Sequence, residues 1–190
     1  MLIKDENKKL NLVERQILFS EFMKLDGESI VPINVVRYLE ENDFFKKPAA
    51  IKYHGNYTGG LFDHSLAVAK TLVKMTKELG IKWKNPRSPY IVGMFHDLCK
   101  MDDYINEAPP LDTPIWQYNN DKVLKGHGDK SIMMLSQLMT LSEEEMLCIR
   151  FHMGAYETEG WNEYDKAIKK YETVLWTHTA DMYASKVMGI

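Results

Sequence analysis

The sequence is poor in cysteine and has no long hydrophobic run. Among its 190 residues only Cys99 and Cys148 are cysteines, and they lack the paired spacing of a structural zinc site. Both lie within apolar helical patterns, so we expect buried free thiols and no disulfide. No stretch reaches about 18 consecutive apolar residues, and the first ten residues are mostly charged or polar. We therefore expect a cytoplasmic protein with no membrane span, secretory signal or membrane partner.

A strong excess of charge of either sign is also absent. The formal net charge of -3 argues against a protein that coats nucleic acid. A local surplus of positive charge from Lys70 to Arg87 is typical of a solvated helix face. Because 45% of the residues are apolar, the chain can bury one sizeable core, and its length suits a single domain.

The apolar residues recur mainly at helical spacing, which predicts an all-α fold. Asn11 and Glu14 begin a first helix that ends at Asp26-Gly27, and Pro32 suits the start of a second. Thr58 is placed to cap a long third helix that ends at Gly80.

Two later segments depart from this helical pattern. Residues 115–118 and 122–124 flank Asn119-Asn120-Asp121, which predicts a short β-hairpin near residues 115–124 that can cover a pocket. Residues 157–170 read as a polar interruption before the last helix.

A histidine and an aspartate end the apolar run that begins at Ile91. We expect His96 and Asp97 near the inner end of a short helix. An unpaired buried carboxylate is costly, and a metal ion shared with the neighbouring imidazole is its most economical partner. The alternative is a core histidine beside a capping aspartate.

Further candidate ligands also fall in helical patterns. Each histidine alone fits a hydrogen-bonded core residue equally well, and a one-turn pair such as His178 and Asp181 fits a simple hydrogen bond. Together, however, four imidazoles and two carboxylates suit one or two first-row divalent metals better than calcium or structural zinc. These candidate metal ligands are His64, His96, Asp97, His127, His152 and Asp181.

Taken in order, these motifs resemble the HD-domain superfamily of metal-dependent phosphohydrolases. The family pattern is a histidine, a later His-Asp doublet and a distal aspartate. The motifs look most like the HD domain of bacterial 3′-to-5′ exonucleases over roughly residues 44–186. They are residues 48–50, 57–65, 96–100, 125–127 and 178–181.

The resemblance implies a helical bundle that forms one domain over residues 1–190, with N-terminal helices in 11–42 and a metal-binding core at about 44–186. It also implies one ion held by His64, His96, Asp97 and Asp181. A second ion would be held by His127 and His152 with a bridging Asp97. Because the simplest members lack these two histidines, we expect a binuclear centre with iron or manganese; magnesium, cobalt, nickel and zinc are alternatives.

The expected activity is cleavage of a phosphomonoester or phosphodiester in a nucleotide or another small phosphate ester. Asp97 would orient a metal-activated water, and Lys100, one turn later, would meet phosphate charge. The alternative for Lys100 is an exposed surface lysine. His54, in the loop before the third helix, is a candidate substrate contact.

Two other functions use the same residues. One is an HD-type di-iron oxygenase, and the other is a catalytically idle module that binds a nucleotide. A short nucleic acid is a second substrate class. The case for it is weaker, because the exonuclease relatives carry an oligonucleotide-binding domain before the HD domain, whereas only residues 1–43 precede the motifs here. The chain also departs from the family at Cys99, where glycine is common, at Tyr53-His54, where a His-His pair is usual, and at His152-Met153, where relatives often have two histidines.

Overall fold

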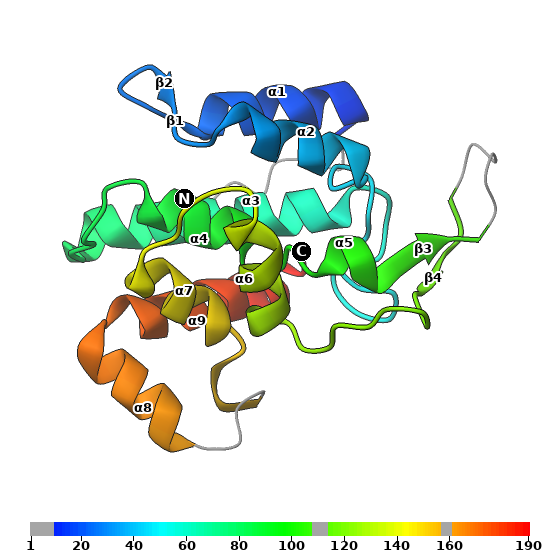
Figure 1. The fold of residues 1–190 in the computed structure, drawn as a ribbon. Coiled ribbons are helices and arrows are strands. Elements are labelled where there is room, and N and C mark those ends of the chain that lie inside the picture. The colour runs from blue at the N-terminus through cyan, green and yellow to red at the C-terminus, as the bar shows by residue number, and fades with distance from the viewer. Residues whose placement is uncertain (1–9, 108–113, 157–160) are drawn as a thin grey trace.

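The computed structural model describes residues 10–107, 114–156 and 161–190, and in these ranges the protein is mainly helical (Figure 1). The predicted all-α fold is confirmed. The helices are α1 (Leu12–Phe22), α2 (Ile33–Glu41), α3 (Gly60–Leu79), α4 (Ser88–Phe95), α5 (Lys100–Asp103), α6 (Gly128–Ser136), α7 (Glu143–Arg150), the 3-10 turn η1 (Gly154–Tyr156), α8 (Trp161–Lys170), α9 (Thr173–Met182) and the π-helix η2 (Tyr183–Met188).

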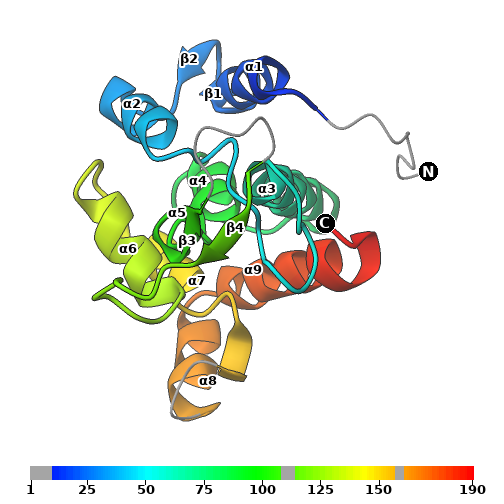
Figure 2. The same ribbon diagram turned by 90° about the vertical axis from the view of Figure 1, so that its right-hand side faces the viewer.

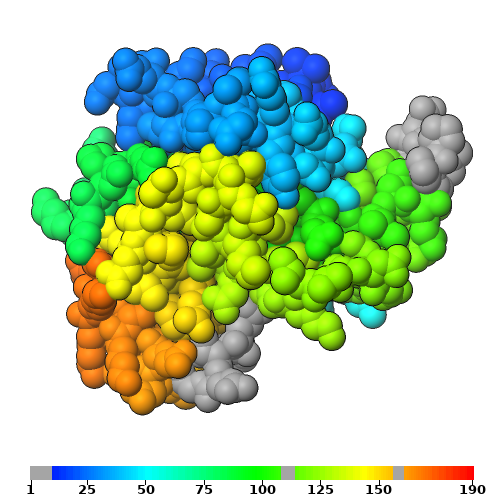
Figure 3. Space-filling model, viewed as in Figure 1, coloured from blue at the N-terminus to red at the C-terminus, as the bar shows by residue number. Residues whose placement is uncertain are grey.

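Helices α3 and α4 form the central layer of the protein. Helices α1 and α2 cover one side of it, and α6, α7 and α9 pack on the other side (Figures 1 and 2). The space-filling view shows that α6 and α7 cover the middle of one face (Figure 3). Helix α8 packs outside α9, and η2 returns the chain against α3.

Aromatic rings join the N-terminal helices to the central layer. Phe19 of α1 makes edge contacts with Phe45, at 5.6 Å between ring centroids, and with Phe95 of α4, at 6.4 Å. Phe45 also contacts Phe62 of α3 at 5.4 Å. All four rings are buried. Aromatic burial of this kind contributes most strongly to core stability, so α1 is an integral part of the fold.

The ends of several helices follow their sequence signals. Capping boxes are present at Asn11 and Ser142, where each side chain accepts a hydrogen bond from the third residue of its helix. Gly80 ends α3 in the left-handed region, as predicted. The expected cap at Thr58 is wrong, because Gly59 is the N-cap of α3 with φ of +89°. The Arg15 guanidinium lies where a Cβ at Gly59 would be, so a larger residue does not fit there.

The predicted hairpin at residues 115–124 is wrong in its pairing. Strand β4 (Trp116–Tyr118) pairs with β3 (Tyr104–Asn106) in an antiparallel register that matches Tyr118 with Tyr104. Residues 122–124 form no strand. Asn119, expected in the turn, instead donates its backbone N–H to the Asp103 carbonyl at 2.9 Å. This bond holds the end of β4 against α5.

Two further elements were missed in the sequence. Residues 161–170 form α8, although the segment from 157 was expected to be irregular; residues 157–160 lie outside the described ranges. Only Tyr164 and Ala167 of α8 are buried, so its apolar signal is weak. A tight hairpin joins β1 (Lys24–Leu25) to β2 (Glu28–Ser29). Asp26 and Gly27 both have positive φ there, as an Asp-Gly hairpin turn requires.

Two expectations about the whole chain can be compared with the structure. Cys99 and Cys148 are buried free thiols, as predicted. Within the described residues, no helix combines the length and apolar character needed to cross a membrane.

Candidate metal centre

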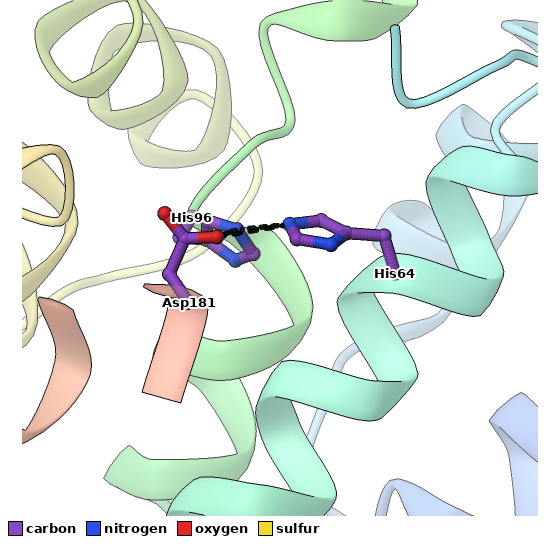
Figure 4. Close-up of side chains that lie close together, drawn as sticks. All are labelled: His64, His96 and Asp181. Carbon is purple, nitrogen blue, oxygen red and sulfur yellow. Dashed lines mark hydrogen bonds and ion pairs between the residues drawn. The ribbon is translucent and has the colours of Figure 1, made fainter. Parts of the chain in front are cut away.

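Side chains from three separate helical segments meet in the core. His64 lies in the second turn of α3, His96 directly follows α4, and Asp181 lies near the end of α9 (Figure 4). The His64 Nε2 atom is 3.2 Å from the Asp181 Oδ1 atom and 3.2 Å from the His96 Nε2 atom. Both histidines are completely buried, so this group is inside the protein.

Asp97 joins this group to a second one. Its Oδ2 atom is 3.7 Å from the Nε2 atoms of both His64 and His96. Its Oδ1 atom is 3.5 Å from the Nε2 atom of His152, which follows the end of α7. One carboxylate therefore faces three imidazoles.

The three imidazoles are oriented by backbone carbonyl groups. The Nδ1 atoms of His64, His96 and His152 lie 2.8, 2.9 and 2.6 Å from the carbonyl oxygens of Ile190, Gly93 and Ile149. A carbonyl oxygen only accepts, so each Nδ1 must carry the proton that it donates. In a neutral ring the Nε2 lone pair then points into the centre, which is how histidines that bind metals are usually held.

The cluster lacks enough protons or cations to satisfy its acceptors. Asp97 Oδ1 and His152 Nε2 are buried and make no hydrogen bond. Two Nε2 lone pairs facing each other at 3.2 Å also need a proton or cation between them. Two metal bonds of about 2.0–2.1 Å at tetrahedral angles place their ligand atoms about 3.3–3.4 Å apart. The two 3.2 Å distances from His64 Nε2 lie close to this value, and the third distance in the group, from His96 Nε2 to Asp181 Oδ1, is 3.9 Å. The group is therefore compatible with a divalent transition metal.

Comparison with known protein families also supports a metal site. The sequence model of the HD domain family matches residues 61–177, which is more than half of the chain. The chain belongs to the HD domain family. The matched region contains His64, His96 and Asp97, whereas Asp181 lies just beyond its end. No curated protein and no solved structure matches the chain. HD domains form a superfamily of metal-dependent phosphohydrolases, and the His/Asp groups of this chain are compatible with divalent metal binding.

We call His64, His96, Asp97, His152 and Asp181 the HD centre. Because these ionisable side chains lie close together and are buried, they change one another's pKa values. Burial alone would raise the pKa of Asp97, but Lys100 and the histidines hold it well below its usual range. Burial also tends to raise the pKa of Asp181, but the neighbouring His64 lowers that pKa to about 2. Both carboxylates are thus charged at neutral pH, and the centre attracts cations.

The histidines divide into two kinds. Burial lowers the pKa of His96 to about 4, so this ring is neutral. Burial has the same tendency at His64 and His152, but Asp181 and Asp97 respectively raise the pKa of these two rings above the ordinary value. Without a metal, His64 and His152 therefore bind a proton more readily than an ordinary histidine does.

Lys100 and His54 lie beside the HD centre. Lys100 begins α5, is only 9% exposed, and places its Nζ atom 3.8 Å from Asp97 Oδ2. The alternative of an exposed surface lysine does not hold. Burial tends to lower the pKa of Lys100, but Asp97 raises it, so the ammonium stays charged. The half-buried His54 ring lies 4.9 Å from the His64 ring between centroids, and burial lowers its pKa.

Among the described residues, the ligand group that contains His127 includes Asp97 but not His152. His127 is the N-cap residue of α6 and lies with Asp97 and Cys99, whereas His152 lies with Asp97 and His96. Cys99 was not among the residues selected from the sequence. Its position two residues after Asp97, where relatives commonly have glycine, is the signal that could have identified it.

Proposed function

We propose that this HD protein cleaves a phosphomonoester or phosphodiester bond in a nucleotide or another small phosphate ester. The observation that carries the proposal is the buried group of His64, His96, Asp97, His152 and Asp181, with the Lys100 ammonium at its edge. The acceptors favour a divalent metal, and the ammonium favours an anionic substrate beside it.

His64, His96 and Asp181 would hold one metal ion, and Asp97, whose Oδ1 atom faces His152, would join this ion to a second. Bound divalent ions supply a hydroxide from water near neutral pH and neutralise phosphoryl oxygens. Asp97 has one oxygen toward each group of histidines, so it is the residue suited to bridge two ions and to orient the attacking water. Asp97 therefore has the central role in the proposed reaction.

Lys100 would act on the substrate. A protonated amine has no lone pair for a metal, and Asp97 keeps this lysine charged. Its Nζ atom lies beside the centre, where it can stabilise negative charge that develops on a phosphoryl group. His54, half-buried beside His64, is the proposed second substrate contact.

The similarity of the motifs to the HD domain of bacterial 3′-to-5′ exonucleases supports a nucleotide as the first substrate class to test. A short oligonucleotide is the second. The di-iron oxygenase and the idle nucleotide-binding module share the same ligands, so both are outcomes of the experiment below.

The metal content is measured first. Purified protein should contain about two equivalents of iron or manganese per chain, as expected for a site with this number of ligands. Asp97→Ala should lose most of this metal, whereas Asp165→Ala, which removes an exposed carboxylate from α8, should keep it. Protein that contains no transition metal and takes none up would contradict the proposal.

The reaction is then tested on nitrophenyl phosphate esters, nucleotides and short oligonucleotides with added manganese, while oxygen uptake is recorded in parallel. We expect release of phosphate or nucleotide, abolished by Asp97→Ala and retained by Asp165→Ala. Substrate-dependent oxygen consumption without phosphoester cleavage would replace this proposal with an oxygenase. Nucleotide binding without turnover in metal-loaded protein would replace it with a binding module.

A further inference from the structure

A third group of potential ligands also contains Asp97. Asp97, Cys99 and His127 each offer one ligand atom, and these atoms all lie within 4.8 Å of one another. The Cys99 Sγ atom is 3.6 Å from the His127 Nδ1 atom. Asp97 is shared with the histidine groups, so this third group is continuous with the centre.

The sulfur-to-nitrogen distance matches two ligands of one ion. Zinc bonds of about 2.3 Å to sulfur and 2.0–2.1 Å to nitrogen, at tetrahedral angles, place the two ligand atoms about 3.6 Å apart. A second observation concerns the carboxylate that this group shares with the histidines. Asp97 is only 5% exposed, and its buried Oδ1 atom makes no hydrogen bond, so this carboxylate still needs a cation.

The position of Cys99 relative to His127 is fixed by α6. The Cys99 backbone N–H donates a hydrogen bond to the Ser131 hydroxyl at 3.1 Å, and Ser131 is buried in the first turns of α6. The Ser131 backbone N–H in turn bonds to the His127 carbonyl at 3.0 Å. One helix therefore holds both the loop that carries the sulfur and the imidazole beside it.

We propose that Cys99 is a metal ligand, and that with Asp97 and His127 it holds a second divalent ion that accepts sulfur. This inference deepens the proposed metal centre and rests on it. The ion displaces the thiol proton, which leaves to solvent, and forms a bond with the thiolate. A thiolate favours zinc, iron or cobalt over magnesium. With three protein ligands, the ion keeps a position for water, as catalytic metal sites do.

Cobalt is the probe for this inference, because a thiolate ligand gives Co²⁺ a charge-transfer absorption band in the near ultraviolet that nitrogen and oxygen ligands do not. The full chain is stripped with a chelator, titrated with Co²⁺ alone, and examined by absorption and elemental analysis without substrate. Wild-type protein should bind about two equivalents and develop the thiolate band. Cys99→Ser should lack the band and bind the second ion at least about tenfold more weakly.

Cys148 provides a matched control. It is also a buried free thiol, but its Sγ atom contacts Thr173 Oγ1 at 3.5 Å and lies in none of the ligand groups found in the described residues. Cys148→Ser should keep the band. Because Cys99 is the one cysteine left in this variant, its band would be assigned to Cys99 even if Cys99→Ser did not fold. His127→Ala should lose the band.

The inference is overturned if wild-type protein binds cobalt without a thiolate band, if it binds no cobalt, or if the band persists in Cys99→Ser. The experiment is independent of turnover. A protein with the band that cleaves no phosphate ester would refute the proposed reaction and keep the ligand. A protein that cleaves phosphate esters but lacks the band would support the proposed reaction and refute Cys99 as a ligand.

Discussion

Asp97 and Asp103 lie six residues apart in the same turn-and-helix segment, and each is only 5% exposed. The Asp103 Oδ1 atom forms ion pairs with Lys122 at 2.8 Å and Lys130 at 3.0 Å. Asp97 has one lysine, Lys100, at 3.8 Å, and one of its oxygens makes no hydrogen bond. The fold satisfies the charge of one buried carboxylate and leaves the other incomplete.

The difference separates a structural carboxylate from one kept for binding. A buried charge without a partner is costly, and folding normally removes that cost by placing cations from the chain around it. Around Asp103 this has happened, and its pairs join α5 to α6 and to the loop after β4. Around Asp97 the neighbours are Lys100 and imidazoles, which supply no positive charge while they are neutral. A proton or a metal ion bound between these groups would complete the charge balance at Asp97.

Removing the single lysine beside Asp97 should give the largest effect. Lys100→Met should leave metal content unchanged and lower kcat/KM by on the order of ten- to a thousandfold, because the lysine meets charge that develops in the transition state. The measurement is steady-state kinetics on the best substrate, together with elemental analysis.

Lys122→Met is the matched control, since it removes a lysine from the Asp103 side. It should keep wild-type kcat/KM. If Lys100→Met also kept the wild-type value, the proposed role of Lys100 in the reaction would be wrong.

The complementary change removes the charge of Asp103, the carboxylate that is paired with lysines. Asp103→Asn should lower the free energy of unfolding by about 2–3 kcal/mol, less than the 3–5 kcal/mol typical of a broken buried pair, because Lys130 keeps Asp102 at 2.7 Å. Denaturant unfolding measures this loss, and the folded variant should retain its full metal content. A variant of unchanged stability that lost metal would show that the two carboxylates are not functionally distinct.

Lowering the pH should weaken metal binding at Asp97 and its neighbouring histidines, without a comparable change at Asp103. This is the smallest of the expected effects. The pKa values of His64 and His152 are raised in the metal-free protein, so protons compete for these nitrogens already at a pH above the ordinary histidine value. Metal affinity should therefore fall between pH 7 and pH 6, by at most about tenfold for each displaced proton. Competition titrations with a metal-sensitive dye at several pH values test this. An affinity that is constant over this range would mean that neither ring exchanges a proton for metal.

The helices could be predicted where local chemistry decides them. The cap at Asn11 and the glycine at position 80 act through their own neighbours in the chain, and each lies where the sequence placed it. The cap of α3 could not be predicted, because the Arg15 side chain from a distant helix occupies the space that selects Gly59.

Strand pairing was harder to predict for the same reason. The residues 115–124 contain a plausible turn, but β4 pairs with β3, which precedes it by ten or more residues. Helix α8 was missed because it buries only two side chains, so its sequence is dominated by its polar face.

The candidate ligands came from residue type and the family resemblance, and their grouping did not. The sequence indicated His64, His96, Asp97 and Asp181, which the structure brings together. It did not indicate that His127 lies with Cys99, because the contact depends on how α6 packs against the turn after α4. Cysteine was judged from its spacing to other cysteines, which carries no information about a site with one sulfur.

The packing of α3 against α4 has a consequence for the choice of ion. A Cβ at Gly93 would lie 2.4 Å from the Ala69 Cα atom, so the two helices meet backbone to backbone, and the Gly93 carbonyl also orients His96. The main chains that carry His64 and His96 therefore cannot separate without opening the core, and the two imidazoles are held 3.2 Å apart between their Nε2 atoms. Calcium prefers oxygen ligands, whereas first-row transition metals accept imidazole nitrogen. The helix contact thus places two nitrogen ligands together in advance and favours a transition metal over calcium.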